Sequence, residues 1–185
     1  MKNLKILTLV ISVLCVYTAC FKSKINGPKF PLETQSGLNT FGCYIDNKAF
    51  IPSTTLFGNV HPLSVYYQPN SSKTYKAGFF SIQGIDARNI AHSGRILIQK
   101  QHVFGPGEYP ISNIPDCDKP YNCDNGDYYS SKQGISYFIE SGKLAITRLD
   151  TANKIVSGRF YFTAKDNLGN KKEITGGVFD AKYDQ

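Results

Sequence analysis

The sequence predicts an all-β domain of mostly antiparallel strands, because three observations agree. Apolar or aromatic residues alternate with polar ones in short runs over residues 39–185. Gly, Asn and Asp interrupt these runs, as they do in turns between strands. Beyond the amino terminus, no long stretch has apolar residues spaced three and four apart, the spacing of an amphipathic helix. We therefore expect a β-sandwich first and a small β-barrel second.

The expected strands follow one another along the chain. They cover residues 41–45, 49–51, 63–68, 80–83, 95–99, 135–139, 144–146, 159–165 and 174–183. We expect turns at Asn47-Lys48, at Ser141-Gly142 and at residues 167–170, and a meander of hairpins at the end. Eight to ten strands in about 145 residues fit a sandwich or a small lipocalin-like barrel. A domain of this size needs no metal or ligand to fold.

Residues 1–19 have the pattern of a secretory signal peptide. Two lysines precede an apolar run at residues 6–16, which is shorter than the roughly 20 residues of a membrane-spanning helix. The tetrapeptide Tyr17-Thr18-Ala19-Cys20 resembles the processing site of bacterial lipoproteins, which implies that Cys20 carries lipid and holds the protein at a membrane. The alternative is a plain secretory signal with Cys20 as an ordinary thiol.

Residues 20–38 form the expected lipidated tether, since the stretch from Phe21 to Pro31 contains Lys, Gly and Pro and lacks periodicity. The resemblance to lipoproteins implies the outer membrane, because Phe21 stands where inner-membrane lipoproteins have Asp. No acidic cluster resembling a surface-export signal occurs up to Phe30, which favours the periplasmic face.

The charge pattern gives no sign of nucleic-acid binding. Loss of Lys2 and Lys5 with the signal lowers the formal net charge from +7 to +5, and the charges are spread, with no basic run beyond Lys171-Lys172. Nucleic-acid-binding domains usually show a basic stripe with interleaved aromatics. We expect no nucleic-acid partner, while contact with anionic lipid or glycan stays an alternative.

Three cysteines remain after processing, namely Cys43, Cys117 and Cys123. Export permits disulfides, and Cys117 and Cys123 flank a short loop with Pro120, so they are the candidate pair. A bridge there would stabilise the fold by about 2–3 kcal/mol. Cys43 lies in a strand-like run, where we expect a buried free thiol.

The most unusual stretch runs from Asp116 to Tyr129 and is expected to be a polar loop. Its candidate ligand-binding residues are Tyr121, Tyr128, Tyr129, Asp124 and Asp127. Tyrosines beside carboxylates and amides suit sugar binding, since the ring offers a flat apolar face. The loop also offers oxygens to calcium, but Pro120 breaks the EF-hand spacing and we assign no metal. The alternative is a solvated loop with local turns.

The sequence assigns no catalytic residue and no cofactor. His61, His92 and His102 lie far apart and lack the spacing of a zinc site. No serine or cysteine nucleophile motif occurs, and the carboxylates Glu108 and Glu140 are a pair of the kind that any β protein offers. We therefore expect a protein that is not an enzyme.

Two segments carry recognisable motifs. The first is Glu33 to Cys43, with the pattern T-Q-x-G-x-N-T-F-G-C, followed by a hairpin at residues 45–52. The second comprises residues 157–164 and 174–180. Both resemble a family of small uncharacterised envelope lipoproteins of the Bacteroidota, which implies an envelope location and this architecture but no activity. Asp150-Thr151-Ala152 resembles the O-glycosylation acceptor of some of these bacteria, with Thr151 as the sugar-bearing residue; the alternative is chance.

These observations predict an outer-membrane-anchored lipoprotein that acts as a non-enzymatic binding or interaction module. One alternative is a carrier of a glycan or small ligand, which a lumen lined by aromatics would favour. Another is a structural scaffold that contacts envelope proteins through the exposed face of Arg159, Tyr161 and Thr163; a wide apolar patch would favour such a partner.

Overall fold

The computed structural model describes residues 29–54, 61–70, 77–88, 93–113 and 124–184. Within these ranges the chain forms ten strands: β1 (Thr40–Ile45), β2 (Lys48–Phe50), β3 (Leu63–Gln68), β4 (Phe79–Asp86), β5 (Gly94–Lys100), β6 (Gly107–Ile111), β7 (Asn125–Ser130), β8 (Ile135–Asp150), β9 (Ile155–Lys165) and β10 (Lys171–Lys182). The predicted all-β class is confirmed. None of the described segments contains a helix long and apolar enough to cross a membrane.

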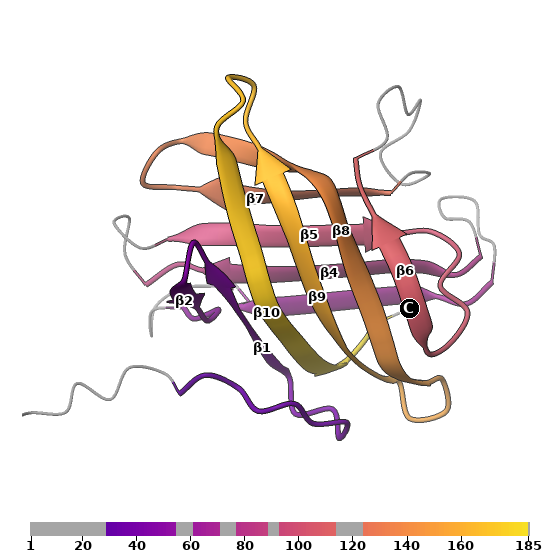
Figure 1. The fold of residues 1–185 in the computed structure, drawn as a ribbon. Helices are drawn as coiled ribbons and strands as arrows, with labels where there is room; N and C mark the ends of the chain where they lie inside the picture. The colour runs from indigo at the N-terminus through magenta and orange to yellow at the C-terminus, as the bar shows by residue number, and fades with distance from the viewer. Residues whose placement is uncertain (1–28, 55–60, 71–76, 89–92, 114–123, 185) are drawn as a thin grey trace, which may run out of the picture.

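All ten strands belong to one curled sheet, and their pairings are antiparallel. The order is β2-β1-β10-β9-β8-β7-β5-β4-β3, with β6 beside β8. Strands β1, β10, β9, β8 and β6 form a front layer in Figure 1, and β7, β5, β4 and β3 cross behind it at a steep angle. The sheet thus forms a half-barrel, consistent with the predicted sandwich or barrel. Strands β8, β9 and β10 form a closing meander, and of the two predicted hairpins only the one that turns at residues 167–170 is present.

Strand β8 is one continuous strand of 16 residues, so the turn predicted at Ser141-Gly142 is wrong. Its beginning pairs with β7 and its later part with β6, and one strand therefore serves both layers. A register shift between Ile139 and Ser141 marks a β-bulge, which bends a strand. A Cβ on Gly142 would lie 2.4 Å from the Cβ of Phe162, so glycine is needed for close packing rather than for a turn.

The hairpin between β1 and β2 turns at Asp46-Asn47, one residue earlier than predicted. Both residues have positive φ angles, 47° and 64°. A two-residue hairpin of type I′ needs positive φ at both positions, and Asp and Asn tolerate it better than other non-glycine residues. The turn places the Asp46 side chain beside β10, where it contacts Lys172.

Aromatic side chains fill the space between the two layers. Phe80 of β4, Phe160 and Phe162 of β9, and Phe179 of β10 are each no more than 2% exposed. The Phe80 ring centroid lies 5.9 Å from that of Phe179, and the Phe160 centroid lies 6.2 Å from that of Phe162. Burying each ring stabilises the fold by about 1.5–3 kcal/mol. These rings occupy the volume that a barrel-type carrier would leave for its cargo.

Short backbone contacts join the edges of the two layers. Beyond β10, the Asp184 N–H donates to the Val65 carbonyl at 3.0 Å, and the Tyr67 N–H donates to the Asp184 carbonyl at 3.0 Å. Beyond β2, the Ser53 N–H donates to the Ile85 carbonyl of β4 at 3.1 Å. The curl of the sheet is therefore held closed at these two points, and a mouth is left between β2 and β7.

Residues 29–38, which we call the strap, lie against the front layer. Phe30 stacks on Tyr44 of β1, with ring centroids 4.6 Å apart. Glu33 forms an ion pair with Arg159 of β9 at 2.5 Å. The part of the expected tether that the structure describes is thus packed on the domain.

The strap is fixed by the carboxylate of Asp180, which is fully buried on β10. The Thr34 hydroxyl and the Gly37 N–H donate to it at 2.6 and 2.8 Å, and the Ser157 hydroxyl of β9 donates at 2.7 Å. The two motif-bearing segments, which begin at Glu33 and end at Asp180, therefore meet at this carboxylate.

Candidate functional site

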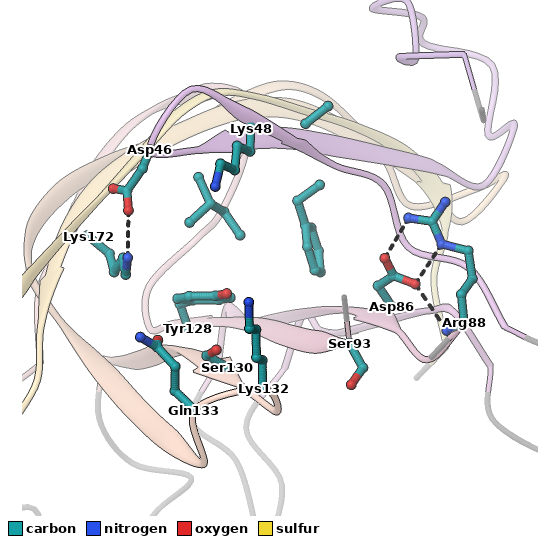
Figure 2. Close-up of a pocket in the computed structure, with 13 residues that line it drawn as sticks. Asp46, Lys48, Asp86, Arg88, Ser93, Tyr128, Ser130, Lys132, Gln133 and Lys172 are labelled. Carbon is teal, nitrogen blue, oxygen red and sulfur yellow. Dashed lines mark hydrogen bonds and ion pairs between the residues drawn. The ribbon is translucent and has the colours of Figure 1, made fainter. Parts of the chain in front are cut away.

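A pocket of about 570 Å³ opens at the mouth between the β1–β2 hairpin and strands β4 and β7. Figure 2 shows its lining, with the hairpin above and the back layer below. We call it the mouth pocket. Its volume is within the range of small-molecule sites. It is lined by Ile45, Asp46, Lys48, Ala49, Phe50, Asp86, Arg88, Ser93, Tyr128, Ser130, Lys132, Gln133 and Lys172.

The acid Asp46 at one end of the pocket is bound to a base. Lys172 Nζ donates to Asp46 Oδ2 at 2.6 Å, and the Glu173 N–H donates to Oδ1 at 3.1 Å. Partial burial acts to raise the pKa of Asp46, but these two hydrogen bonds and the charge of Lys48 hold it below its usual value. The hydrogen bond to Asp46 raises the pKa of Lys172. The pair is therefore ionised at neutral pH.

The acid at the other end, Asp86, is held in the same way. Arg88 Nε donates to Asp86 Oδ1 at 2.9 Å and Arg88 Nη2 to Oδ2 at 2.6 Å, a two-pronged contact. Asp86 is only 2% exposed. The hydrogen bond raises the pKa of Arg88 above its usual value. Both carboxylates of the pocket are therefore neutralised by their own basic partners.

Two lysines of the pocket have no such partner among the described residues. Lys48 comes from β2 and Lys132 from the turn between β7 and β8, and both are exposed. In Figure 2 their ammonium groups point from opposite walls into the space between. Neither ammonium group forms an ion pair or hydrogen bond with another residue that the structure describes, and because both carboxylates are paired, the pocket has a net positive charge.

An aromatic residue, Tyr128, forms part of the lower wall. Tyr128 stacks on Tyr137 with ring centroids 5.9 Å apart. Burial raises the pKa of Tyr128, so its hydroxyl stays neutral. The Tyr137 hydroxyl donates to Gln133 Oε1 at 3.1 Å, which leaves the amide NH₂ of Gln133 as a donor at the pocket.

The structure separates the predicted ligand-binding residues. Residues 125–130 form β7, although the sequence predicted a loop over 116–129. Tyr128 lines the mouth pocket, whereas Tyr129 lines a separate pocket beside Arg95. Successive residues of a strand point to opposite faces, so these two tyrosines do not face one ligand.

The two predicted aspartates bind basic groups of the protein itself. Asp124 accepts hydrogen bonds from Lys100 Nζ and, at 2.9 Å, from the Gln101 N–H. Asp127 accepts one from Arg95 at 2.6 Å. Burial raises the pKa of Asp127, against the lowering effect of Arg95.

The other predicted residues have three outcomes. Four of them lie outside the described residues, namely Cys20, Tyr121, Cys117 and Cys123, so the lipid site and the disulfide stay predictions. Thr151 lies in the exposed turn between β8 and β9, and its modification also stays a prediction. Cys43 is a buried free cysteine, as predicted, and burial raises the pKa of its thiol.

The remaining carboxylates considered for chemistry lie on the outer face of the sheet. Glu108 pairs with Lys143 at 2.7 Å, and Glu140 pairs with Lys165 at 2.9 Å and with Lys171 at 2.7 Å. Among the described residues, no group of three or more His, Cys, Asp or Glu side chains could hold a metal ion.

Residues 64–181 match the model of a family described as a domain of unknown function, DUF6252. The match covers more than half of the chain. The chain belongs to this family. The DUF6252 match runs from β3 to β10 and so contains Tyr128, Lys132 and Lys172 of the mouth pocket but not Lys48. No curated protein and no solved structure matches the chain.

The sequence did not reveal the mouth pocket. Its charged residues are spread from Asp46 to Lys172, and only the fold brings them together. Two signals pointed to parts of it, namely the turn after β1 and the Lys171-Lys172 run. Because the DUF6252 description carries no activity, the function has to be argued from this pocket.

Proposed function

We propose that this DUF6252 protein is a lipid-anchored binding protein of the bacterial cell envelope that takes a small polar ligand in its mouth pocket. The signal pattern of residues 1–19 and the lipoprotein-like processing site at Cys20 support anchoring by lipid. Phe21 supports the outer membrane, and the absence of an acidic cluster after it supports the periplasmic face. The resemblance at residues 33–52 supports a lipoprotein of the Bacteroidota type.

The observation that carries the binding role is the pair of lysines, Lys48 and Lys132, that lack an ionic partner among the described residues and face a pocket of small-molecule size. Buried charged groups are usually paired, as Asp86 is here, whereas the exposed ammonium groups of these two lysines are available to a ligand. The filled core favours a polar ligand at the mouth over an apolar cargo between the layers.

Binding without catalysis is the role that the lining favours. A hydrolase of the nucleophile–base kind needs a serine or cysteine beside an available base. The described lining has serines but no histidine or cysteine, and its two carboxylates are held in ion pairs.

A ligand panel tests the binding role. Thermal unfolding of the full-length protein in non-ionic detergent would be followed with neutral glycans, acidic glycans, calcium and a fatty acid. A ligand that binds only the native state, at 100 times its dissociation constant, adds about 2.7 kcal/mol and raises the midpoint. We expect a shift with a glycan. Shifts with the fatty acid alone, or with no member of the panel, would contradict the proposal.

Anchoring has its own test. Cells expressing the protein would be labelled with an alkyne-bearing palmitate and separated into membrane and soluble fractions. We expect label and membrane association in the native protein and neither in Cys20→Ala. Label on both forms would rule out Cys20 as the lipid site.

A second candidate is a structural scaffold for envelope proteins, favoured by the exposure of Tyr161 on β9. Its side chain is 52% exposed on the outer face, beside Thr163. Its neighbour Arg159 is bound by Glu33 of the strap, which leaves less of this face for a partner. Crosslinking in the envelope through a photoreactive residue at 161 would capture a partner if this candidate holds.

A further inference from the structure

We infer that the ligand of the mouth pocket is an acidic sugar, meaning a ring with hydroxyl groups that carries a carboxylate or a phosphate. The inference rests on the proposed binding function and names the chemical class of its ligand. It follows from three features of the pocket, which are its free cations, its neutralised carboxylates and its aromatic wall.

The two lysines without an ionic partner favour an anionic ligand. Lys48 and Lys132 face the pocket from opposite walls, so an anionic group bound in the pocket would be attracted by both ammonium groups. Charge-assisted hydrogen bonds from ammonium groups to an anion are roughly twice as strong as neutral ones. Because the two lysines belong to different elements, the ligand would join the β2 edge to the β7–β8 turn.

The carboxylates of the pocket do not oppose an anion. Asp46 is bound by Lys172 at 2.6 Å and Asp86 by Arg88 at 2.6 Å. Each pair has no net charge, so an entering carboxylate or phosphate meets the uncompensated charge of the two lysines. A cationic ligand would have to face both of them.

The lower wall suits a sugar ring with hydroxyl groups. Tyr128, stacked on Tyr137, offers a flat apolar surface of the kind on which sugar rings lie. Gln133 holds the Tyr137 hydroxyl with its carbonyl oxygen, so its NH₂ group can donate to a ligand hydroxyl. Gln133 follows Lys132 in the same turn, which places the donor next to one of the cations.

Calorimetric titration of the full-length protein in non-ionic detergent tests the ligand class. The probes are glucuronate, glucose 6-phosphate, glucose and inorganic phosphate. We expect at least one of the two acidic sugars to bind at least ten times more tightly than glucose and than inorganic phosphate. The better of the two acids identifies the anionic group as carboxylate or phosphate. Affinity should fall as salt is raised, because the cations are exposed.

Charge-removing variants test the two lysines. Lys48→Gln and Lys132→Gln should each weaken binding of the acidic sugar about tenfold, the loss of one charge-assisted hydrogen bond. Lys182→Gln is the matched control, since Lys182 is exposed on β10 and does not line the mouth pocket. It should bind as the native protein does.

Four outcomes would overturn the inference. If glucose binds as tightly as the acidic sugars, or if affinity is unchanged in both lysine variants, the ligand does not need an anionic group. Either result would still be consistent with a small polar ligand in the pocket. If inorganic phosphate binds as tightly as the acidic sugars, the sugar ring does not contribute to recognition. No binding by either acidic sugar would overturn the ligand class. The proposed function would be overturned only if the unfolding panel showed no shift, or a shift with the fatty acid alone.

Discussion

The Thr34 hydroxyl donates a hydrogen bond of 2.6 Å to the carboxylate of Asp180, across 146 positions of the sequence. The contact joins the strap to the last strand of the sheet. Asp180 also accepts the N–H groups of Ser36 and Gly37, at 2.9 and 2.8 Å. One buried carboxylate thus satisfies several donors of a segment that has no strand partner of its own.

Replacing Asp180 by Ala should destabilise the protein by about 3 kcal/mol, because a charged acceptor is lost and buried donors are left without a partner. Urea unfolding of the two proteins measures the difference. Glu108→Ala is the control, since it breaks an exposed ion pair with Lys143 and should cost less than about 1 kcal/mol. Equal costs for the two variants would show that the buried carboxylate has no special role.

The contribution of Asp180 should depend on pH. Burial acts to raise the pKa of Asp180, but the hydrogen bonds from Thr34, Ser157, Ser36 and Gly37 lower it to about 2. Since the folded pKa is below the unfolded value, this stability is complete above about pH 5 and is lost as the pH falls toward 2. The difference in unfolding free energy between native protein and Asp180→Asn should shrink by roughly 2 kcal/mol from pH 6 to pH 2. A difference independent of pH would contradict the assignment.

The strap should open when its hydroxyl contact is removed. Thr34→Val keeps the shape of the side chain but removes the hydrogen bond to Asp180, at a cost of about 1 kcal/mol. Hydrogen exchange followed by mass spectrometry should then show faster exchange in peptides covering residues 34–38. Peptides from β9 should exchange as in the native protein, and faster exchange there would mean that the whole sheet had loosened.

Gly142 should be intolerant of any side chain. A Cβ at this position would lie 2.4 Å from the Tyr161 carbonyl oxygen, so Gly142→Ala should destabilise the fold by about 2 kcal/mol. Gly105→Ala is the matched control, because a Cβ at that position would have no other heavy atom within 4 Å among the described residues beyond its chain neighbours. Thermal unfolding of both variants would show a lowered midpoint for the first alone; matching midpoints would contradict the close packing of β8 on β9.

The Cys43 thiol should resist alkylation in the folded protein. Burial raises the pKa of this thiol and removes it from solvent, and only the thiolate reacts readily. Peptide mapping after iodoacetamide treatment at pH 8 should show Cys43 unmodified without denaturant and modified in urea. Rapid modification of the native protein would place this side chain at the surface.

Alternation of residue types predicted most of the sheet because each strand buries one face. The strand over residues 63–68 was found with the same bounds, and the last hairpin, which turns at residues 167–170, was also found. β6 and β7 were missed because Pro110, Gly126 and Asp127 are typical of loops, and the sequence does not show that β5 and β8 pair with these segments. The Ser141-Gly142 pair was wrongly interpreted as a turn, because small residues occur both in turns and at β-bulges.

The candidate site was less predictable than the fold. Tyr128 was chosen for its amide and carboxylate neighbours in sequence, yet those that the structure describes, Asp124, Asn125 and Asp127, do not line the mouth pocket. Asp124 and Asp127 bind Lys100 and Arg95 across strands, contacts that depend on strand order. The free lysines of the mouth pocket could not be predicted either, because only the folded structure shows whether a lysine has an acidic partner.

Chemical-shift mapping of the ¹⁵N-labelled protein with the better-binding acidic sugar tests the central claim most directly. If the mouth pocket is the binding site, the amide signals that move will cluster at Asp46 to Phe50 and at Tyr128 to Gln133. The signals of Asp124 and Thr151 will stay in place. Shifts confined to the outer face around Tyr161, or spread without a cluster, would contradict the account.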